Sequence, residues 1–218
     1  MASTENKKKR RVGGPVEGKI VLLGDSGVGK SSIAQRFCFD KFDETHDVTI
    51  GGAYLQKTVT IPPRQEDGKL LSESQVKLHI WDTGGSEKFR SMINLYYRDA
   101  VGAIICFDLT DERSFESVQY WINQMKDNTS YNDGGFVMAL AGNKCDTPPD
   151  MQRVQSSMSL ELAKKYNMIY KEVSAKTGQG LPDMFRQLAE EVHKICQNWS
   201  IVNFKIYYKY GRGFGVLG

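Results

Sequence analysis

The stretch that decides the fold is GDSGVGKS, from Gly24 to Ser31, which has the spacing G-x-x-x-x-G-K-S. It directly follows KIVLLG, a short apolar run that begins at Lys19, and it precedes a stretch of helical character. Glycines in such a loop let backbone N–H groups turn toward phosphate oxygens, and the following helix N-terminus adds its positive dipole end. Because strand and helix stand where this loop requires them, the stretch predicts a phosphate-binding loop rather than a chance match.

Outside this loop the chain alternates between strand-like and helix-like segments. GAIICFDLT and FVMALAGNK, like KIVLLG, are apolar throughout, which is typical of strands buried on both faces. Two stretches carry apolar residues at helical spacing, and we interpret both stripes as core packing. They are Phe115, Val118, Ile122 and Met125, in a helix that begins near Ser114, and Met184, Phe185, Leu188, Val192 and Ile195. The alternation predicts an α/β fold with a mostly parallel sheet and helices on both faces.

One region, TVTIPPRQEDGKLLSESQVKLHIWD at residues 58–82, breaks the alternation. It predicts two strands joined by a long polar loop, because Pro62 and Pro63 end the first strand and alternation resumes near Val76. We expect the two strands to form an antiparallel hairpin at the edge of the sheet.

Both ends of the chain differ from the body. Residues 1–17 are polar and basic, so we expect a disordered tail, with one domain over residues 18–198. The segment KKKRR at residues 7–11 leaves three interpretations open: a solvated tail, attraction to anionic lipid, or a nuclear-import signal. Residues 199–218 are aromatic and basic and contain no acidic residue, and we expect an irregular extension there.

Composition excludes several classes of protein. The net charge of +3 comes from residues 1–18, and the other 200 residues balance, which argues against a nucleic-acid-binding domain. No apolar run approaches the roughly 18 residues of a membrane span, and the N-terminus lacks the apolar core of a secretory signal. The cysteines, at positions 38, 106, 145 and 196, show no metal-binding spacing. We therefore expect free thiols in a reducing cytoplasm.

NKCD, from Asn143 to Asp146, favours guanine over adenine as the base. It ends a predicted strand, where ligands of open α/β sheets bind. The Asp146 carboxylate can accept hydrogen bonds from both N1–H and the 2-amino group of guanine, a pair that adenine does not offer. Asn143 would bond the oxygen side of the base and brace its loop, and the stem of Lys144 would pack on the ring. Alone, the motif also suits an ordinary turn.

VSAKTG, at residues 173–178, strengthens this interpretation because it ends the next predicted strand. There the backbone N–H of Ala175 would meet the guanine carbonyl oxygen, and Lys176 would lie over the base.

Oxygen-bearing residues on the phosphate side predict a Mg²⁺ site. Lys30 would reach the β- and γ-phosphates, while the Ser31 hydroxyl would bind the metal. Thr49 in HDVTIGG and Asp82 in WDTGG add further oxygens, the latter through water, and the Gly85 N–H would touch the γ-phosphate. An isolated Thr or Asp is more often a cap or turn residue, but the order of all the motifs favours the metal site. If the Thr49 hydroxyl binds Mg²⁺ only when a γ-phosphate is present, its loop would order with GTP and loosen after hydrolysis, which makes a switch.

The motifs GDSGVGKSS, TIG, WDTGGSEKFRSM, YYRDA and NKCD resemble, in wording and order, those of the Rab branch of the Ras superfamily. The resemblance covers roughly residues 18–198, and TIGGAYLQKTV leans toward the endosomal Rabs. It implies the small-GTPase fold, with six strands, one of them an antiparallel edge strand, and five helices. It also implies a monomeric switch that binds GTP or GDP with Mg²⁺. Such a switch acts with an exchange factor, a GTPase-activating protein and effectors in vesicle traffic, on the cytosolic face of endosomal or other endomembranes.

The resemblance assigns residues by position. Nucleotide contacts are implied for Asp25, Ser26, Gly27, Val28, Gly29, Lys30, Ser31, Ser32, Phe42, Thr49, Gly85, Asn143, Lys144, Asp146, Ser174, Ala175 and Lys176. Metal ligands are implied at Ser31, Thr49 and Asp82, and catalytic groups at Lys30, Thr49, Gly85 and Ser86. Tyr54, Trp81 and Tyr96 match the exposed aromatic cluster through which Rabs contact effectors, although ordinary packing around the hairpin is the alternative.

Three features depart from the Rab pattern. Rabs usually read W-D-T-A-G-Q-E, whereas this chain has Gly84 for the alanine and Ser86 for the glutamine. The loop inside the hairpin, PPRQEDGKLLSES, is longer than usual. Cys196 is followed by 22 residues, and the final GVLG is not a C-a-a-X box, so we expect weak membrane binding.

The change at Ser86 bears on the reaction. Serine is too short to orient the attacking water as glutamine does in this family, so we expect a GTPase with slow intrinsic hydrolysis. The alternative is a GTP-locked binding or scaffold protein without useful turnover. An ATP-using P-loop kinase would share the phosphate loop, but not NKCD together with SAK.

Overall fold

The computed structural model describes residues 16–44, 49, 52–66, 68–84, 96–129 and 135–210, with the backbone alone at 66, at 69 and over 198–210. Its strands are β1 (Val16–Leu23), β2 (Gly52–Ile61), β3 (Arg64–Glu66), β4 (Lys69–Leu71), β5 (Ser74–Thr83), β6 (Ala100–Asp108), β7 (Val137–Asn143) and β8 (Ile169–Glu172). Its helices are α1 (Lys30–Phe39), α3 (Glu112–Glu116), α4 (Val118–Asn128), α5 (Ser156–Lys165) and α6 (Leu181–Tyr210), with a short 3₁₀ turn at Pro149–Met151.

Six strands form one sheet in the order β2-β5-β1-β6-β7-β8. Strand β2 is antiparallel to β5, from the pair Gly52–Thr83 to the pair Ile61–Ser74, and the other neighbours are parallel. The expected fold class, and the antiparallel hairpin at the sheet edge, are therefore confirmed. The polar loop of the hairpin holds a small two-stranded sheet of its own, β3 with β4, which the sequence pattern did not predict.

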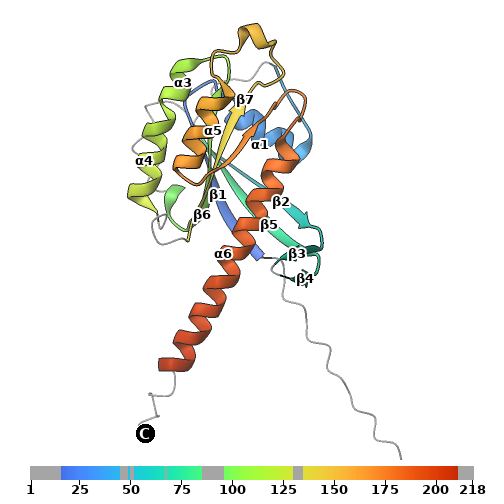
Figure 1. Cartoon of the computed structure of the whole chain (residues 1–218), viewed down its shortest axis with the longest axis vertical. Coiled ribbons are helices and arrows are strands. Elements are labelled where there is room, and N and C mark those ends of the chain that lie inside the picture. The colour runs from blue at the N-terminus through green and yellow to red at the C-terminus, as the bar shows by residue number, and fades with distance from the viewer. Residues whose placement is uncertain are drawn as a thin grey trace, which may run out of the picture.

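Helices cover both faces of the sheet (Figure 1), so the central strands are buried on both sides. In β1, Ile20 and Leu22 belong to the core cluster that includes α1 and α6 residues, while Val21 and Leu23 belong to the cluster that includes α4 residues. Successive side chains of a strand point to opposite faces, which explains why the strand sequences are apolar throughout.

The two predicted helical stripes pack as expected. Val118, Ile122 and Met125 of α4 are fully buried, and Asp111 caps the preceding α3 by accepting from the Arg113 N–H at 3.1 Å. One helix was expected here, but α3 and α4 are separated by a single residue. In α6 the apolar stripe from Met184 to Val192 is buried as well.

Two boundaries differ from the expected ones. Strand β1 begins at Val16, inside the expected tail of residues 1–17, of which residues 1–15 lie outside the described part. The irregular structure expected over 199–218 is wrong for 199–210, which continue α6 beyond the body of the domain (Figure 1). No Gly or Pro interrupts residues 183–210, so nothing in the backbone stops the helix before Gly211. Residues 211–218 lie outside the described residues.

Within the residues that the structure describes, no helix combines the length and the apolar character needed to cross a membrane.

Candidate nucleotide-binding site

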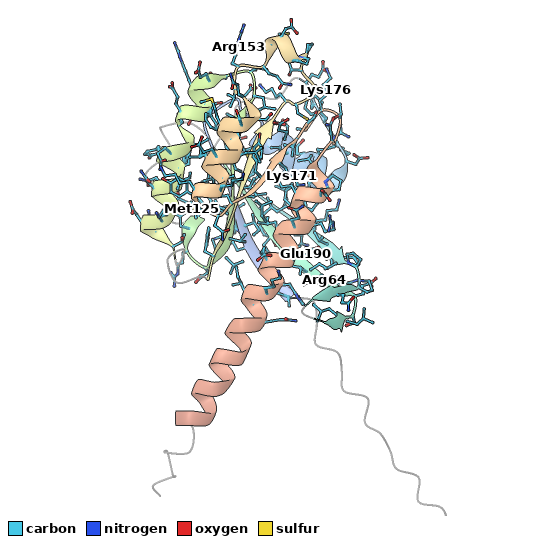
Figure 2. All side chains as sticks on the ribbon, viewed as in Figure 1. Arg64, Met125, Arg153, Lys171, Lys176 and Glu190 are labelled. Carbon is cyan, nitrogen blue, oxygen red and sulfur yellow. The ribbon has the colours of Figure 1, made fainter. Side chains whose placement is uncertain are left out.

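The predicted motifs lie where the parallel strands end. The loop of residues 24–29 joins β1 to α1, Asn143 is the last residue of β7, and Ala175 follows β8. Lys176 lies at this end of the molecule, whereas Arg64 of the small hairpin lies toward the opposite end (Figure 2). Because the strands are parallel, their carboxyl ends bring these loops to one edge of the sheet.

The loop of residues 24–29 needs glycine at two positions. Gly24 has φ +136°, and a Cβ there would come within 2.2 Å of the Cys106 carbonyl oxygen. Gly29 has φ +92°, and a Cβ there would come within 2.3 Å of the Asn143 side-chain nitrogen. Both the backbone conformation and the available space therefore exclude side chains, which lets the loop curl tightly.

Lys30 begins α1 and spans the loop. Its ammonium group donates to the carbonyl oxygens of Gly24 at 2.8 Å and Asp25 at 2.7 Å, and the residue is only 5% exposed. Burial lowers the pKa of this ammonium group. The first turn of α1 contains no acidic residue, so the helix end and Lys30 together offer a positive site for a phosphate group.

The other residues expected to contact the nucleotide in this region differ in their exposure to solvent. Ser26 and Gly27 are exposed, Val28 is buried, and Ser32 is half-buried in α1.

The residues expected to hold a metal are brought together in part. The Ser31 Oγ lies 2.6 Å from the Thr49 Oγ1, although the two residues are 18 positions apart. Asp82, at the end of β5, is 2% exposed and pairs in register with Leu22, just before the phosphate loop. Two hydroxyls and a carboxylate would make an all-oxygen donor set, which is the chemistry that Mg²⁺ prefers.

Asn143 connects the phosphate loop to the loop after β8. Its side-chain nitrogen donates to the Val28 carbonyl at 2.8 Å, and its side-chain oxygen accepts from the Ala175 N–H at 3.1 Å. Asn143 is 2% exposed, so both bonds are shielded from water. The Ala175 N–H, expected to face the guanine carbonyl, thus has a protein acceptor in this structure. Ser174, which is fully buried, accepts from the Thr177 N–H and stiffens the same loop.

Three other residues were expected on the base side. Asp146 is exposed in the turn after β7. Lys144 has φ +66° and pairs with Asp108 at 2.5 Å, which fixes the direction of its side chain across the end of β6. Phe42, expected to contact the nucleotide, is half-buried against the core cluster that includes α1 residues.

Two contacts around the Ala175 loop had no signal in the sequence. Arg36 of α1 donates to the carbonyl oxygens of Ala175 at 2.9 Å and Lys176 at 2.6 Å. The Lys176 ammonium group pairs with Glu44 at 2.8 Å, and this hydrogen bond raises the Lys176 pKa. Arg36 and Glu44 are far from the Ala175 loop in sequence and belong to no motif, so only the folded chain shows these contacts.

The three aromatic residues expected to form a surface cluster do meet. The ring centroids of Tyr54 and Trp81 are 5.5 Å apart, and those of Trp81 and Tyr96 are 5.8 Å apart. Tyr54 is 50% exposed. Its hydroxyl also lies 2.6 Å from the His79 Nδ1, and the His79 Nε2 lies 2.8 Å from a Glu17 carboxylate oxygen. The cluster therefore has a polar extension along β5 and β1.

Two predicted catalytic residues, Gly85 and Ser86, lie outside the described residues. Their positions relative to Lys30 and Thr49 therefore stay predictions.

Comparison with known proteins shows the family of the chain. A family model described as the Ras family matches residues 19–194. Ras-related protein Rab-5B of Plasmodium falciparum is 45% identical over 175 residues, covering 80% of this chain and 77% of that protein. GTP-binding protein YPT52 of Saccharomyces cerevisiae is 38% identical, covering 81% and 82%, and Ras-related protein RABF2a of Arabidopsis thaliana is 36% identical, covering 89% and 87%. The chain belongs to the Rab branch of the Ras family of small GTPases.

Proposed function

We propose that this Rab GTPase is a Mg²⁺-dependent GTP/GDP switch with slow intrinsic hydrolysis. The observation that carries the proposal is the position of Asn143, which bonds both Val28 of the phosphate loop and Ala175 of the base-side loop. A phosphate site and a base site joined through one buried side chain suit a ligand that has both parts. Burial of that side chain keeps the two sites at a fixed separation.

The phosphate side supplies charge and the metal ligands. Lys30 and the N-terminus of α1 would stabilise the phosphates, and Ser31, Thr49 and Asp82 would hold Mg²⁺. When bound, Mg²⁺ neutralises the charge that develops on the phosphate oxygens. The contact between Ser31 and Thr49 supports a switch, because Thr49 precedes β2 and belongs to a different segment from the phosphate loop. Its segment would order around GTP and loosen after hydrolysis.

The expected partners follow from this arrangement. An exchange factor would release GDP, a GTPase-activating protein would accelerate hydrolysis, and effectors would bind the cluster of Tyr54, Trp81 and Tyr96. The 50% exposure of Tyr54 supports a contact role over packing alone. We place the protein on the cytosolic face of endomembranes, with the endosome as the specific proposal.

A second candidate is a GTP-locked binding protein without useful turnover, which the serine at position 86 favours. The test begins with the nucleotide carried by protein purified from its own cell. GTP there would support the locked form, whereas GDP would show turnover. Competition of GTP against ATP for the emptied site tests the base assignment, and equal binding of the two would contradict it. Single-turnover phosphate release, with and without a GTPase-activating protein, then measures hydrolysis.

A further inference from the structure

A groove lies on the sheet face opposite α1 and α6, between the α3–α4 segment and α5. Its volume is about 410 Å³, and its lining residues come from positions 112–119 and 158–165. None of them belongs to the phosphate loop, the base-side loops or the aromatic cluster. The groove is therefore separate from the nucleotide site and from the expected effector surface.

The floor of the groove is apolar. Phe115 and Leu162 are half-buried against the core, and Met158 is 46% exposed. Flexible methionine side chains adapt to different apolar partners, so an exposed one in a groove suits a binding surface. The floor thus offers apolar area that the chain itself leaves in contact with water.

The rim of the groove is acidic. Glu112, Glu116 and Glu161 are all exposed, and within the described part of the chain none of them forms an ion pair. The cation that also lines the groove, Lys165, lies over the Tyr166 ring at 5.3 Å. Glu112 stands in the first turn of α3, where it stabilises the helix start. The other two carboxylates have no such role, and their charge is left for a partner to balance.

We infer that this groove binds an amphipathic helix of another protein, one whose apolar stripe is flanked by Lys or Arg. A furrow between two helices accepts the i, i+3, i+4 and i+7 side chains of a third helix, so its apolar floor selects the stripe. The acidic rim selects the basic flanks, speeds association and makes it sensitive to salt.

Segments of this chain fit the groove less well than such a partner helix does. KKKRR at residues 7–11 would match the rim, but it has no apolar residue to fill the floor. Residues 199–210 carry apolar and basic residues, but they continue α6, which packs on the opposite face of the sheet.

The test uses the full chain loaded with GDP and a fluorescein-labelled helical peptide of 18 residues. The peptide carries leucines at i, i+3, i+4 and i+7 spacing with lysines beside them, and its charge-reversed version, with glutamates for the lysines, is the control. We expect salt-dependent binding of the lysine peptide alone, with NMR shifts confined to residues 112–119 and 158–165. Because the groove lacks nucleotide-site residues, the affinity should be the same in the GTP analogue form.

Variants locate the interaction. The pair Glu116→Lys and Glu161→Lys should weaken peptide binding at least tenfold, and Met158→Ser should weaken it several-fold at high salt, where charge is screened. The matched control is Glu73→Lys with Asp127→Lys, two exposed acids away from the groove, which should leave affinity unchanged. Equal binding of the charge-reversed peptide, shifts centred elsewhere, or no effect of the rim variants would overturn the inference. Concentration-dependent dimers without peptide, abolished by the rim variants, would also overturn it and assign the groove to a second copy.

Discussion

The indole N–H of Trp121 donates to a carboxylate oxygen of Asp25 at 3.0 Å, although the two residues are 96 positions apart. Trp121 belongs to α4 and is 1% exposed, while Asp25 belongs to the phosphate loop. The backbone carbonyl of Asp25 also accepts from Lys30. The buried indole therefore holds the same residue that accepts a hydrogen bond from Lys30, the lysine expected to bind phosphate.

We expect Trp121→Phe to speed nucleotide release. Phenylalanine keeps most of the apolar volume but cannot donate, so the loop loses one bond worth about 1 kcal/mol, or roughly a fivefold change in dissociation rate. GDP and GTP should be affected alike, because Asp25 does not distinguish the γ-phosphate. Release of a fluorescent nucleotide after mixing with excess unlabelled nucleotide measures the rate.

Two Asp25 variants distinguish the loss of the Trp121–Asp25 hydrogen bond from a general loss of protein stability. Asp25→Asn retains a side-chain oxygen that accepts from the indole, and it should release nucleotide at nearly the original rate. Asp25→Ala should match Trp121→Phe, and the double variant should be no faster than either. Additive effects of the two changes would show that the residues act independently, contrary to the structure.

Asp146→Asn should move the base preference from guanine toward xanthine. The carboxylate is expected to accept two hydrogen bonds from the guanine edge, whereas xanthine has a carbonyl there, to which an amide would donate. Asp146 is exposed in its turn, so the substitution should leave the unfolding midpoint unchanged. Competition between GTP and XTP measures the preference, and a variant that still prefers GTP would show that another residue reads the base.

Ser31→Asn should weaken GTP binding roughly tenfold more than GDP binding, which corresponds to about 1.4 kcal/mol. The Ser31 hydroxyl lies 2.6 Å from that of Thr49, so a larger side chain disturbs both expected metal ligands at once. The GTP form should depend on them more, because Thr49 is expected to contact the metal only beside a γ-phosphate. Dissociation constants at matched Mg²⁺ provide the measurement. Equal weakening of the two nucleotides would contradict the metal assignment.

Cys106→Ala should make the protein less sensitive to alkaline pH. Burial raises the pKa of the Cys106 thiol from the ordinary 9.0 to about 12. Between these values the unfolded chain loses the thiol proton while the folded chain keeps it, so the unfolded state binds fewer protons and stability falls as pH rises. Removing the thiol should reduce this fall by up to about 1.4 kcal/mol per pH unit.

Urea unfolding at pH 7, 9 and 10.5, in the presence of a reductant, measures that slope. The free energy of unfolding of the original chain and of the variant should each be expressed relative to its own value at pH 7. This is needed because the smaller side chain also changes packing in the core. An unchanged slope above pH 9 would mean that other groups dominate the alkaline loss.

Short-range patterns explain why much of the fold was predictable. The phosphate loop, the apolar strands and the helical stripes are each defined within about ten residues, and parallel strands bring their ends together. The links from Arg36 to Ala175 and from Trp121 to Asp25 join residues about a hundred or more positions apart, so no local pattern signals them. The helix over 199–210 was missed because its mixed apolar and basic residues show no single stripe, although nothing in the sequence breaks it.

Ser86→Gln should raise the single-turnover rate of GTP hydrolysis. Hydrolysis needs a water held in line behind the γ-phosphorus, and in the family this chain resembles a glutamine holds it. A serine side chain is shorter than glutamine by two bonds, and Gly84 nearby adds backbone freedom that weakens preorganisation. A tenfold increase needs only about 1.4 kcal/mol of extra transition-state stabilisation. Affinity for GTP should change little, because Lys30, Ser31 and Asp82 are untouched.

The informative comparison is between this variant and the original chain, each with and without a GTPase-activating protein. An arginine supplied by such a partner is worth about 10³–10⁵ in rate, so a partner can compensate for a weak intrinsic site. If Ser86→Gln leaves the intrinsic rate unchanged while a partner strongly accelerates the original chain, Ser86 is not the limiting feature. The protein would then be an ordinary switch whose catalytic groups come from its partner. The availability of that partner would then limit the rate of turnover.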